Sequence, residues 1–232
     1  MRLLHMKDKK LLCQQNIVHH VHPFLDKQSG KPRLIEAPDD QIKAIQKELK
    51  GLLSTIAVPD NVFSGIKGKS YIDNARLHSG YVFKIDLTAF FPSISRDKVY
   101  SFFQNDLKCS PDVAEALSNL TTIDLSLVKN EPVEEIYSFL STKKAACNNH
   151  LISGSPSSQI LSYLVNRAMF DEMQKLADKL STRMSIYVDD ITFSCDHKIP
   201  DYFKHSVLRI VKKNGYAISI SKVKSYKKMR PS

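Results

Sequence analysis

The sequence predicts an α+β fold class, in which helices pack on a sheet of strands. Residues 81–87 alternate between apolar and polar side chains, which is the period of a half-buried strand. Residues 184–194 read as two β-rich pieces that meet at a pair of aspartates, which predicts a hairpin. Apolar residues recur at helical spacing in residues 39–53 and again in residues 160–169, so amphipathic helices are expected as well.

The length and composition favour a folded chain. With 232 residues, a core can form in one compact unit or in two interlocked subdomains. Hydrophobic residues make up 42% and charged residues 25%, which are ordinary values for a folded protein and argue against disorder. No internal repeat, low-complexity tract or Gly/Ser linker divides the sequence, so we expect one continuous globule.

The charge balance is strongly basic. The formal net charge is +10, from 34 Lys and Arg against 24 Asp and Glu. Such an excess favours a polyanionic partner, with nucleic acid as the leading candidate, because basic side chains neutralise phosphates. The alternative is a solvated basic surface that serves solubility alone.

Cysteines and hydropathy indicate the compartment. Cys13, Cys109, Cys147 and Cys195 lie far apart, without the paired spacing of a zinc site or a thiol-exchange motif. This usage is typical of a reducing cytoplasm. No run of about 18 apolar residues occurs, so neither a membrane-spanning nor a secreted protein is expected.

Several element boundaries can be placed along the chain. The strand at residues 81–87 should end before Pro92, and Ser95 or Arg96 should begin a helix. Ser155 followed by Pro156 predicts the start of a helix with a buried stripe from Ile160 to Met169. A further helix is expected over residues 202–213, then a last strand over residues 216–220 and a basic tail.

Two adjacent aspartates at the hairpin turn, Asp189 and Asp190, carry a chemical cost. Like charges repel, and carboxylates framed by apolar residues are poorly solvated. A divalent cation relieves both costs, and two magnesium ions about 4 Å apart can align an attacking hydroxyl with a leaving pyrophosphate. Asp86, at the end of the strand 81–87 and away from its more apolar face, is the best third ligand. The alternative is a polar turn and a capping aspartate.

Three motifs in order carry a resemblance to reverse transcriptases. The segment 187–190, Tyr-Val-Asp-Asp, resembles the Tyr-x-Asp-Asp motif of that family. Residues 83–87 and 90–94 are similar to its first catalytic motif, and residues 151–164 to its Leu-Pro-Gln-Gly-x-Pro-x-Ser helix motif. Ser153 stands where the family usually has glutamine.

Two further motifs refine the resemblance. Residues 30–38 resemble the basic hairpin of the fingers of these polymerases. Residues 74–78 match the Asn-Ala-x-x-His element that is characteristic of retron reverse transcriptases. The likeness extends over residues 20–226, so the chain resembles a bacterial reverse transcriptase of the retron type.

The resemblance implies a role for each matching residue. Asp86, Asp189 and Asp190 would be the catalytic residues and hold two magnesium ions. The deoxynucleoside triphosphate would be bound by residues from several motifs, namely Lys31, Arg33, Phe91, Gly154, Ser155 and Lys222. Within this set Phe91 matches the steric gate against a ribose 2′-hydroxyl. Asn74 and His78 would bind RNA, although His78 can also be read as a structural histidine.

The resemblance also implies an architecture. The expected fold is that of a right-hand polymerase with an antiparallel palm sheet packed on helices. Fingers are expected at residues 1–79 and 104–150, and palm at residues 80–103 and 151–232. The sequence ends after the last palm strand, so we expect no thumb. Either the chain is a truncated piece of a longer protein, or a second chain, an oligomer contact or the RNA supplies the missing grip.

The implied reaction is RNA-templated DNA synthesis in the cytoplasm. The partners would be a cognate noncoding RNA, its DNA product and an accompanying effector protein, with no membrane and a role in phage defence. Two alternatives stay open. One is an abortive-infection type of reverse transcriptase that makes untemplated DNA, and the other is a catalytically silent RNA-binding scaffold.

Overall fold

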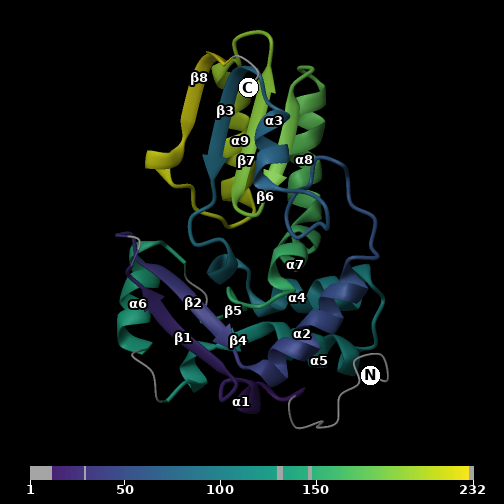
Figure 1. Cartoon of the computed structure of the whole chain (residues 1–232), viewed down its shortest axis with the longest axis vertical. Coiled ribbons are helices and arrows are strands. Elements are labelled where there is room, and N and C mark those ends of the chain that lie inside the picture. Colours follow the sequence, from purple (N-terminus) through teal and green to yellow (C-terminus); the bar gives the residue numbers. More distant parts are fainter. Residues whose placement is uncertain (1–11, 29, 130–132, 146–147, 230–232) are drawn as a thin grey trace. The chain divides into compact units, whose positions relative to one another are not determined.

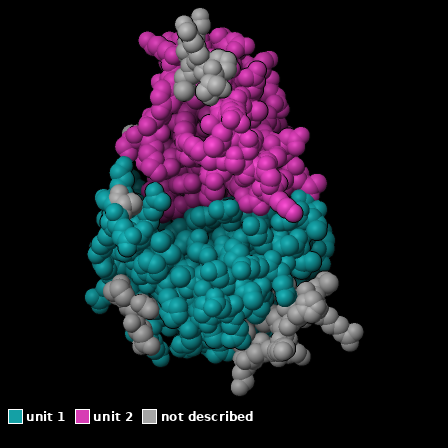
Figure 2. All heavy atoms as spheres, viewed as in Figure 1, with its two compact units in different colours: residues 1–56, 91–165 teal, residues 57–90, 166–232 magenta. Residues whose placement is uncertain are grey.

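The chain forms two compact units. The computed structural model describes residues 12–28, 30–129, 133–145 and 148–229. Unit 1 comprises residues 1–56 and 91–165, and unit 2 comprises residues 57–90 and 166–232 (Figure 2). These bounds differ from the expected fingers and palm, because unit 2 includes residues 57–79 and excludes residues 91–103 and 151–165. The functional division into fingers and palm stays a prediction.

Unit 2 is built on a four-stranded antiparallel sheet (Figure 1). The strand order is β6-β7-β3-β8. The strands are β3 (Gly80–Asp86), β6 (Arg183–Tyr187), β7 (Asp190–Cys195) and β8 (Lys224–Met229), and the helices of this unit are α3 (Tyr71–Arg76), α8 (Arg167–Asp178) and α9 (Asp201–Lys213). The predicted α+β class and antiparallel pairing are therefore confirmed.

Alternation along β3 divides its side chains between two faces. Phe83 and Ile85 are buried, and the Phe83 ring stacks on Phe193 of the neighbouring strand β7. Phe193 in turn meets Phe203 of α9 edge to face, with ring centroids 5.2 Å apart. Since successive strand residues point to opposite faces, Lys84 and Asp86 lie on the face away from this aromatic core.

The strand predicted over residues 216–220 is reduced to one antiparallel bridge between Ile218 and Leu87. Tyr216 instead packs its ring against Phe90 and donates a hydrogen bond to Asn166 Oδ1 at 2.6 Å. Strand β8 forms in the lysine-rich segment that the sequence indicated as a basic tail, and it pairs with β3 at the edge of the sheet. An edge strand can carry several lysines because one side of it is not covered by another strand.

Unit 1 combines helices with two small antiparallel sheets. Its strands are β1 (Val21–Asp26) paired with β2 (Arg33–Pro38), and β4 (Thr122–Asp124) paired with β5 (Asn149–Leu151). Its helices are α1 (Gln14–Ile17), α2 (Asp40–Leu53), α4 (Arg96–Ser101), α5 (Pro111–Thr121), α6 (Val133–Thr142) and α7 (Ser158–Val165), with short 3-10 segments at Phe91–Ser93 and Leu125–Leu127.

The helix starts expected near Asp39 and Ser95 follow the capping rules, whereas the one expected at Ser155 does not. The side chains of Asp39 and Ser95 accept hydrogen bonds from the first turns of α2 and α4. The helix predicted to begin at Ser155 begins at Ser158 instead, because residues 156 and 157 form a turn. Asn166, which is not helical, separates α7 from α8, so the single predicted helix is two.

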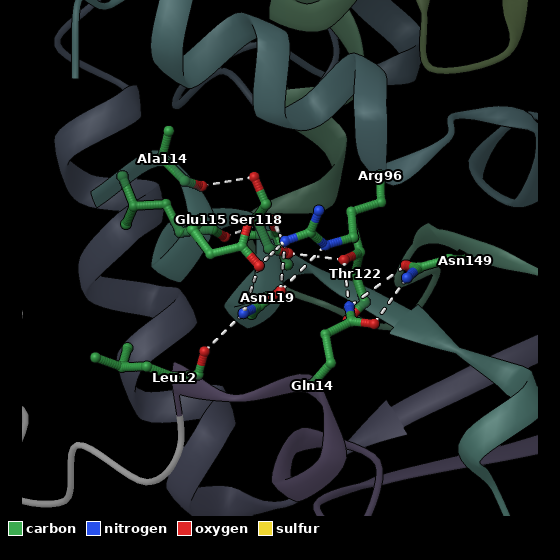
Figure 3. Close-up of polar contacts among 11 residues, drawn as sticks. Leu12, Gln14, Arg96, Ala114, Glu115, Ser118, Asn119, Thr122 and Asn149 are labelled. Carbon is green, nitrogen blue, oxygen red and sulfur yellow. Dashed lines mark hydrogen bonds and ion pairs between the residues drawn. The ribbon is translucent and has the colours of Figure 1, made fainter. Parts of the chain in front are cut away.

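A network of polar side chains fixes the first described residues of unit 1 (Figure 3). Arg96 donates to Glu115 at 2.5 Å and to Asn119 at 2.8 Å, and Asn119 donates to the Leu12 carbonyl at 2.7 Å. Gln14 donates to the Thr122 hydroxyl at 2.8 Å. The network therefore links the N-terminal part of the unit to α4, α5 and β4.

Two further findings concern membrane spans and cysteines. In the stretches that the structure describes, no helix is both long and apolar enough to cross a membrane. Cys13, Cys109 and Cys195 are free thiols, while Cys147 lies outside the described residues.

Candidate active site

Three aspartates gather at one end of the sheet in unit 2. Asp86, the last residue of β3, stands directly opposite Asp190, the first residue of β7. The backbone N–H of Leu87 donates to the Asp189 carbonyl at 2.9 Å, so the turn lies beside the end of β3. The carboxylates that the sequence predicted to act together therefore come from adjacent strand ends.

The turn that carries Asp189 has an unusual backbone. Tyr187 pairs with Asp190, so Val188 and Asp189 form a two-residue loop. Val188 has a φ of 58°, a left-handed conformation that a β-branched residue rarely adopts. The Ser64 hydroxyl accepts a hydrogen bond from the Val188 N–H. A strained turn held by a neighbouring segment is a feature of functional sites.

The segment before α3 supports this turn. Phe63 N–H donates to the Ile186 carbonyl at 2.9 Å, and Ile186 N–H donates to the Asn61 carbonyl at 3.0 Å. Residues 61–64 thus run along the outer edge of β6. The position of Asp189 is fixed by two neighbours, the end of β3 on one side and this segment on the other.

Two lysines pair with the aspartates. Lys84 donates to Asp190 Oδ2 at 2.8 Å, and Lys222 donates to Asp86 Oδ2 at 2.6 Å. Lys222 was predicted from the sequence as a substrate-binding residue. Lys84 was missed, although its place two residues before Asp86 on the same strand face was a signal that could have found it.

The ionisation of these groups reflects burial and crowding. Burial raises the pKa of Asp189 to about 6, and the negative charge of Asp86 adds to the effect. Burial also raises the pKa of Asp86, although its hydrogen bond with Lys222 acts in the opposite direction. Burial lowers the pKa of Lys84, but the hydrogen bond to Asp190 and its charge outweigh this and raise the pKa overall.

The donor set suits divalent cations. Three carboxylates on adjacent strand ends are ligands that magnesium prefers, and their mutual repulsion is relieved by positive charge. Throughout the described stretches, no three His, Cys, Asp or Glu side chains are placed closely enough to hold a metal ion. The two lysines provide the positive charge in this arrangement.

A cavity of about 430 Å³ adjoins the carboxylates in unit 2. Its walls come from α3 and from strands β3, β7 and β8. It is lined by Tyr71, Asn74, Ala75, His78, Val82, Lys84, Asp86, Asp190, Thr192, Lys222, Lys224 and Tyr226. Basic groups, aromatic rings and carboxylates therefore share one hollow, which is a composition suited to part of a nucleic acid.

The two residues predicted to bind RNA both line this cavity. The His78 ring bonds the hydroxyls of Ser194 at 2.8 Å and Ser185 at 2.6 Å, which ties the segment after α3 to β6 and β7. Burial lowers the pKa of His78 to about 4, with a smaller effect of the positive charge of Arg183. His78 is thus a neutral histidine with both ring nitrogens bonded. Asn74 is buried.

Other predicted site residues belong to unit 1. Lys31 and Arg33 are exposed at the start of β2. Gly154 lies against the same hairpin, and its N–H donates to the Glu36 carbonyl at 3.2 Å. A Cβ atom at Gly154 would stand 2.3 Å from that carbonyl oxygen, so only glycine fits.

Buried polar contacts hold the hairpin to this loop. Glu36 and His150 are fully buried and lie 2.7 Å apart. Ser153, at the position where the family usually has glutamine, donates its N–H to Glu36 Oε2 at 2.8 Å and its hydroxyl to the Leu34 carbonyl at 3.2 Å. The loop of Gly154 is therefore fixed to the strand that follows Lys31 and Arg33.

The remaining two predicted residues are also in unit 1. Ser155 is buried and shares a hydrogen bond of 2.9 Å with Ser157. Phe91 begins a 3-10 segment and is half-buried. The predicted site thus divides between the units, with the aspartates, Lys222, Asn74 and His78 in unit 2 and the remaining residues in unit 1.

An antiparallel sheet with three carboxylates at adjacent strand ends, two of them in a Tyr-x-Asp-Asp turn, suits metal-assisted phosphoryl transfer to or from nucleic acid. The family model described as "Reverse transcriptase (RNA-dependent DNA polymerase)" matches residues 25–231. The chain belongs to this family.

The curated relatives that the chain matches include several retron reverse transcriptases. It is 30% identical over 203 residues to the retron Se72 reverse transcriptase of Salmonella heidelberg, covering 84% of this chain and 46% of that protein. It is 25% identical over 191 residues to the retron Ec83 reverse transcriptase of Escherichia coli, covering 81% of this chain and 56% of that protein. It is 27% identical over 217 residues to the retron Mx65 reverse transcriptase of Myxococcus xanthus, covering 91% of this chain and 49% of that protein.

These matches confirm the predicted resemblance to retron reverse transcriptases. The chain spans about half the length of the curated relatives that it matches.

Proposed function

We propose that this chain carries the catalytic centre of an RNA-directed DNA polymerase of the retron type. The observation that carries the proposal is the carboxylate cluster, in which Asp86 stands opposite the strained Tyr-x-Asp-Asp turn. In the proposed reaction a primer hydroxyl attacks a deoxynucleoside triphosphate, one P–O bond forms, and pyrophosphate leaves.

Asp86 and Asp189 would hold two magnesium ions, with Asp190 assisting. When bound, the ions neutralise phosphate charge and align the hydroxyl with the leaving group. The chain itself positions these ligands through the pairing of β3 with β7 and through the contact of Ser64 with Val188. Lys84 and Lys222 balance the carboxylate charge on the same sheet face.

The residues of unit 1 would bind the incoming nucleotide. Lys31 and Arg33 are exposed cations with the reach to clamp a triphosphate, and Arg33 can form paired hydrogen bonds to phosphate oxygens. Phe91 would reject a ribose 2′-hydroxyl on that nucleotide. Gly154 and Ser155 would form the floor under the base, and the hydrogen bond that attaches Gly154 to β2 supports this role.

The partners would be nucleic acids. We infer a cognate structured noncoding RNA as template, its DNA product, and a contribution of Asn74 and His78 to RNA handling, supported by the net charge of +10. An effector protein, a role in phage defence and a cytoplasmic location follow from the retron likeness. A grip on the template from a thumb or a second chain belongs to the same proposal.

One observation favours a rival function. Asp86 and Asp190 are neutralised by lysines of the same chain, as in a protein that no longer binds metal. A catalytically silent RNA-binding scaffold would bind RNA and incorporate no nucleotide. An abortive-infection type of enzyme would instead incorporate nucleotides without copying a template.

The test is incorporation of labelled deoxynucleotides on an RNA template with a DNA primer in magnesium. The chain is compared with Asp189→Ala and with Asp196→Ala, a control at an exposed aspartate of the same unit. Template-dependent synthesis that only Asp189→Ala removes supports the proposal. Synthesis that ignores the template favours the untemplated enzyme, and RNA binding without any synthesis in the presence of the cognate RNA favours the scaffold.

A further inference from the structure

The carboxylate of Glu36 is completely buried in unit 1. Glu36 lies on β2 and is 0% exposed, and both of its carboxylate oxygens have partners. Oε1 lies 2.7 Å from His150 Nε2, and Oε2 accepts the Ser153 N–H at 2.8 Å. Burial of a carboxylate is costly, and an apolar side chain of similar size often stabilises a core as well or better. The two oxygens of Glu36 therefore serve a purpose other than filling the core.

The backbone around Glu36 is held by the loop that follows β5. Glu36 stands opposite Pro23 of β1, and proline has no N–H to donate. The Ser153 hydroxyl accepts the Glu36 N–H at 3.1 Å and donates to the Leu34 carbonyl at 3.2 Å. The Gly154 N–H donates to the Glu36 carbonyl at 3.2 Å. Ser153 and Gly154 thus bond β2 as a neighbouring strand would.

His150 continues the connection to the segment that begins at Phe91. His150 lies on β5 and is fully buried. The next residue of this strand, Leu151, donates its N–H to the Ile94 carbonyl at 3.0 Å. Ile94 in turn donates its N–H to the Phe91 carbonyl at 3.0 Å. The carboxylate of Glu36 therefore joins β2 to the backbone that carries Phe91.

Three segments that lie far apart in the sequence meet at this one side chain. They are the hairpin with Lys31 and Arg33, the loop with Gly154, and the segment with Phe91, and all of them belong to unit 1. In the proposed function each binds a different part of the incoming nucleotide. Arg33 and Glu36 lie three strand positions apart and so point to opposite faces of β2, where Arg33 is exposed and Glu36 is buried. Any effect of Glu36 on the nucleotide is therefore exerted through the positions of these segments.

We propose that Glu36 is a positioning residue for the incoming deoxynucleoside triphosphate. Its two carboxylate contacts fix three parts relative to one another, namely the hairpin that binds the triphosphate, the loop under the base and the segment of Phe91. The inference rests on the proposed polymerase function for its ligand, whereas the connection between the segments can be measured without any ligand. Loss of these contacts should weaken nucleotide binding and sugar selection. The reaction of a bound nucleotide should change little, because the aspartates belong to unit 2.

The first experiment measures single-nucleotide incorporation at a series of concentrations of dATP and of ATP. In Glu36→Leu, which removes both acceptors, KM for dATP should rise about tenfold, and the preference for dATP over ATP should fall about tenfold. The rate at saturating dATP should change by less than about threefold. Glu36→Gln keeps both links, because its oxygen can accept the Ser153 N–H and its amide can donate to a neutral His150 ring. This variant should therefore behave like the unchanged chain.

Gln46→Leu is the matched control for the loss of a buried polar group. Gln46 is fully buried in α2 of the same unit, and its amide donates to the Leu120 carbonyl at 2.9 Å. Both leucine substitutions leave buried groups unpaired and should lower stability. Only Glu36→Leu should change KM and the sugar preference, and both quantities are independent of how much of a variant folds.

Hydrogen exchange measures the connection itself, without nucleotide or metal. The N–H groups of residues 36, 151 and 154 are each hydrogen-bonded to another of the joined segments, so they should exchange slowly in the unchanged chain. In Glu36→Leu their exchange should become about tenfold faster relative to the N–H groups of α6, because the segments separate more readily. In Gln46→Leu this ratio should stay the same.

Several results would overturn the inference. These are an unchanged KM and sugar preference in Glu36→Leu, the same changes in Gln46→Leu, equal losses in Glu36→Gln and Glu36→Leu, or unchanged exchange at the three positions. A chain that incorporates no nucleotide, although exchange at these positions rises in Glu36→Leu, would refute the proposed function and leave Glu36 as the residue that joins the three segments.

Discussion

The polar cluster around Arg96 in unit 1 and the carboxylate cluster of unit 2 solve the burial of charge in opposite ways. In the first, a guanidinium meets a carboxylate and an amide, and that amide is also bonded to a backbone carbonyl (Figure 3). In the second, two of the three carboxylates each pair with a lysine. Within the described residues, the third carboxylate, that of Asp189, has no lysine within hydrogen-bonding distance. The first arrangement stabilises the fold, whereas the second costs stability.

The difference helps to distinguish structural polar clusters from functional ones. Satisfied clusters are typical of structural roles, since each donor has an acceptor and little is gained by adding a ligand. Clusters of like charge with raised pKa values are typical of functional sites, because a ligand or cation can relieve the repulsion. Substitutions in the two clusters should therefore change stability with opposite sign.

The largest effect is expected for Asp189→Asn. Removing the negative charge should lower nucleotide incorporation on the order of 10³-fold, because a metal ligand is lost. The same change should raise the free energy of unfolding by about 2 kcal/mol at neutral pH without metal, since the raised pKa reflects a charge that is costly to bury. Denaturant unfolding in the presence of a chelator measures this change in the free energy of unfolding. A variant that is less stable than the unchanged chain would contradict the comparison.

His78 and Asp189 should contribute to the pH dependence of stability in opposite directions. The pKa of His78, about 4, lies below the ordinary 6.5, so its contribution to stability is fully present above pH 6.5. As the pH falls from 6.5 towards 4, up to about 3 kcal/mol of this contribution should be lost, because the unfolded chain takes up the proton first, whereas Asp189, with a pKa raised to about 6, offsets part of the loss. His78→Gln should remove the loss, measured by urea unfolding at several pH values. His205→Gln, at an exposed histidine of α9, should leave the slope unchanged.

In unit 1, Arg96→Ala should destabilise the protein by about 2 kcal/mol, because the buried Asn119 loses its charged donor. Thermal and denaturant unfolding measure the loss. Lys204→Ala is the matched control, since Lys204 pairs with an exposed aspartate, Asp201, and such surface pairs contribute little. Equal effects of the two substitutions would mean that the cluster is not structural.

The smallest effect is expected at the turn. Ser64→Ala removes the acceptor of the Val188 N–H and should cost about 1 kcal/mol. Because the turn holds Asp189, incorporation should fall as well, while Ser54→Ala, at an exposed hydroxyl that bonds the end of α2, should leave incorporation unchanged. Primer-extension rates at saturating nucleotide distinguish the Ser64→Ala variant from the Ser54→Ala control. An unchanged rate in Ser64→Ala would show that the turn keeps its shape without the hydrogen bond.

Much of unit 2 could be predicted because its periodicity is local. The alternation of residues 81–87 placed β3, and the paired β-rich pieces around Asp189 placed the hairpin. Helix α9, at Asp201–Lys213, lies within one residue of its expected start. Helix α9 keeps its pattern because it has one buried and one exposed face.

The rest depended on contacts between segments far apart in the sequence. Strand β8 was missed because its lysines read as a solvated tail, and only pairing with β3 makes it a strand. The ion pair of Lys84 with Asp190 joins residues 106 positions apart. The contact of Glu36 with His150 likewise joins residues 114 positions apart and follows from no local pattern.

The close approach of Gly154 to the β2 backbone has a mechanical consequence. The hairpin of β1 and β2 is clamped at its root, where Glu36 meets His150, Ser153 and Gly154, while Lys31 and Arg33 stand exposed towards its tip. The root therefore holds the register of the hairpin, and near the tip Lys27 forms an ion pair with Glu135 of α6 at 2.5 Å. A side chain at position 154 would push the Glu36 backbone away from this loop. The position of Lys31 and Arg33 would then change, although neither residue contacts the substituted side chain.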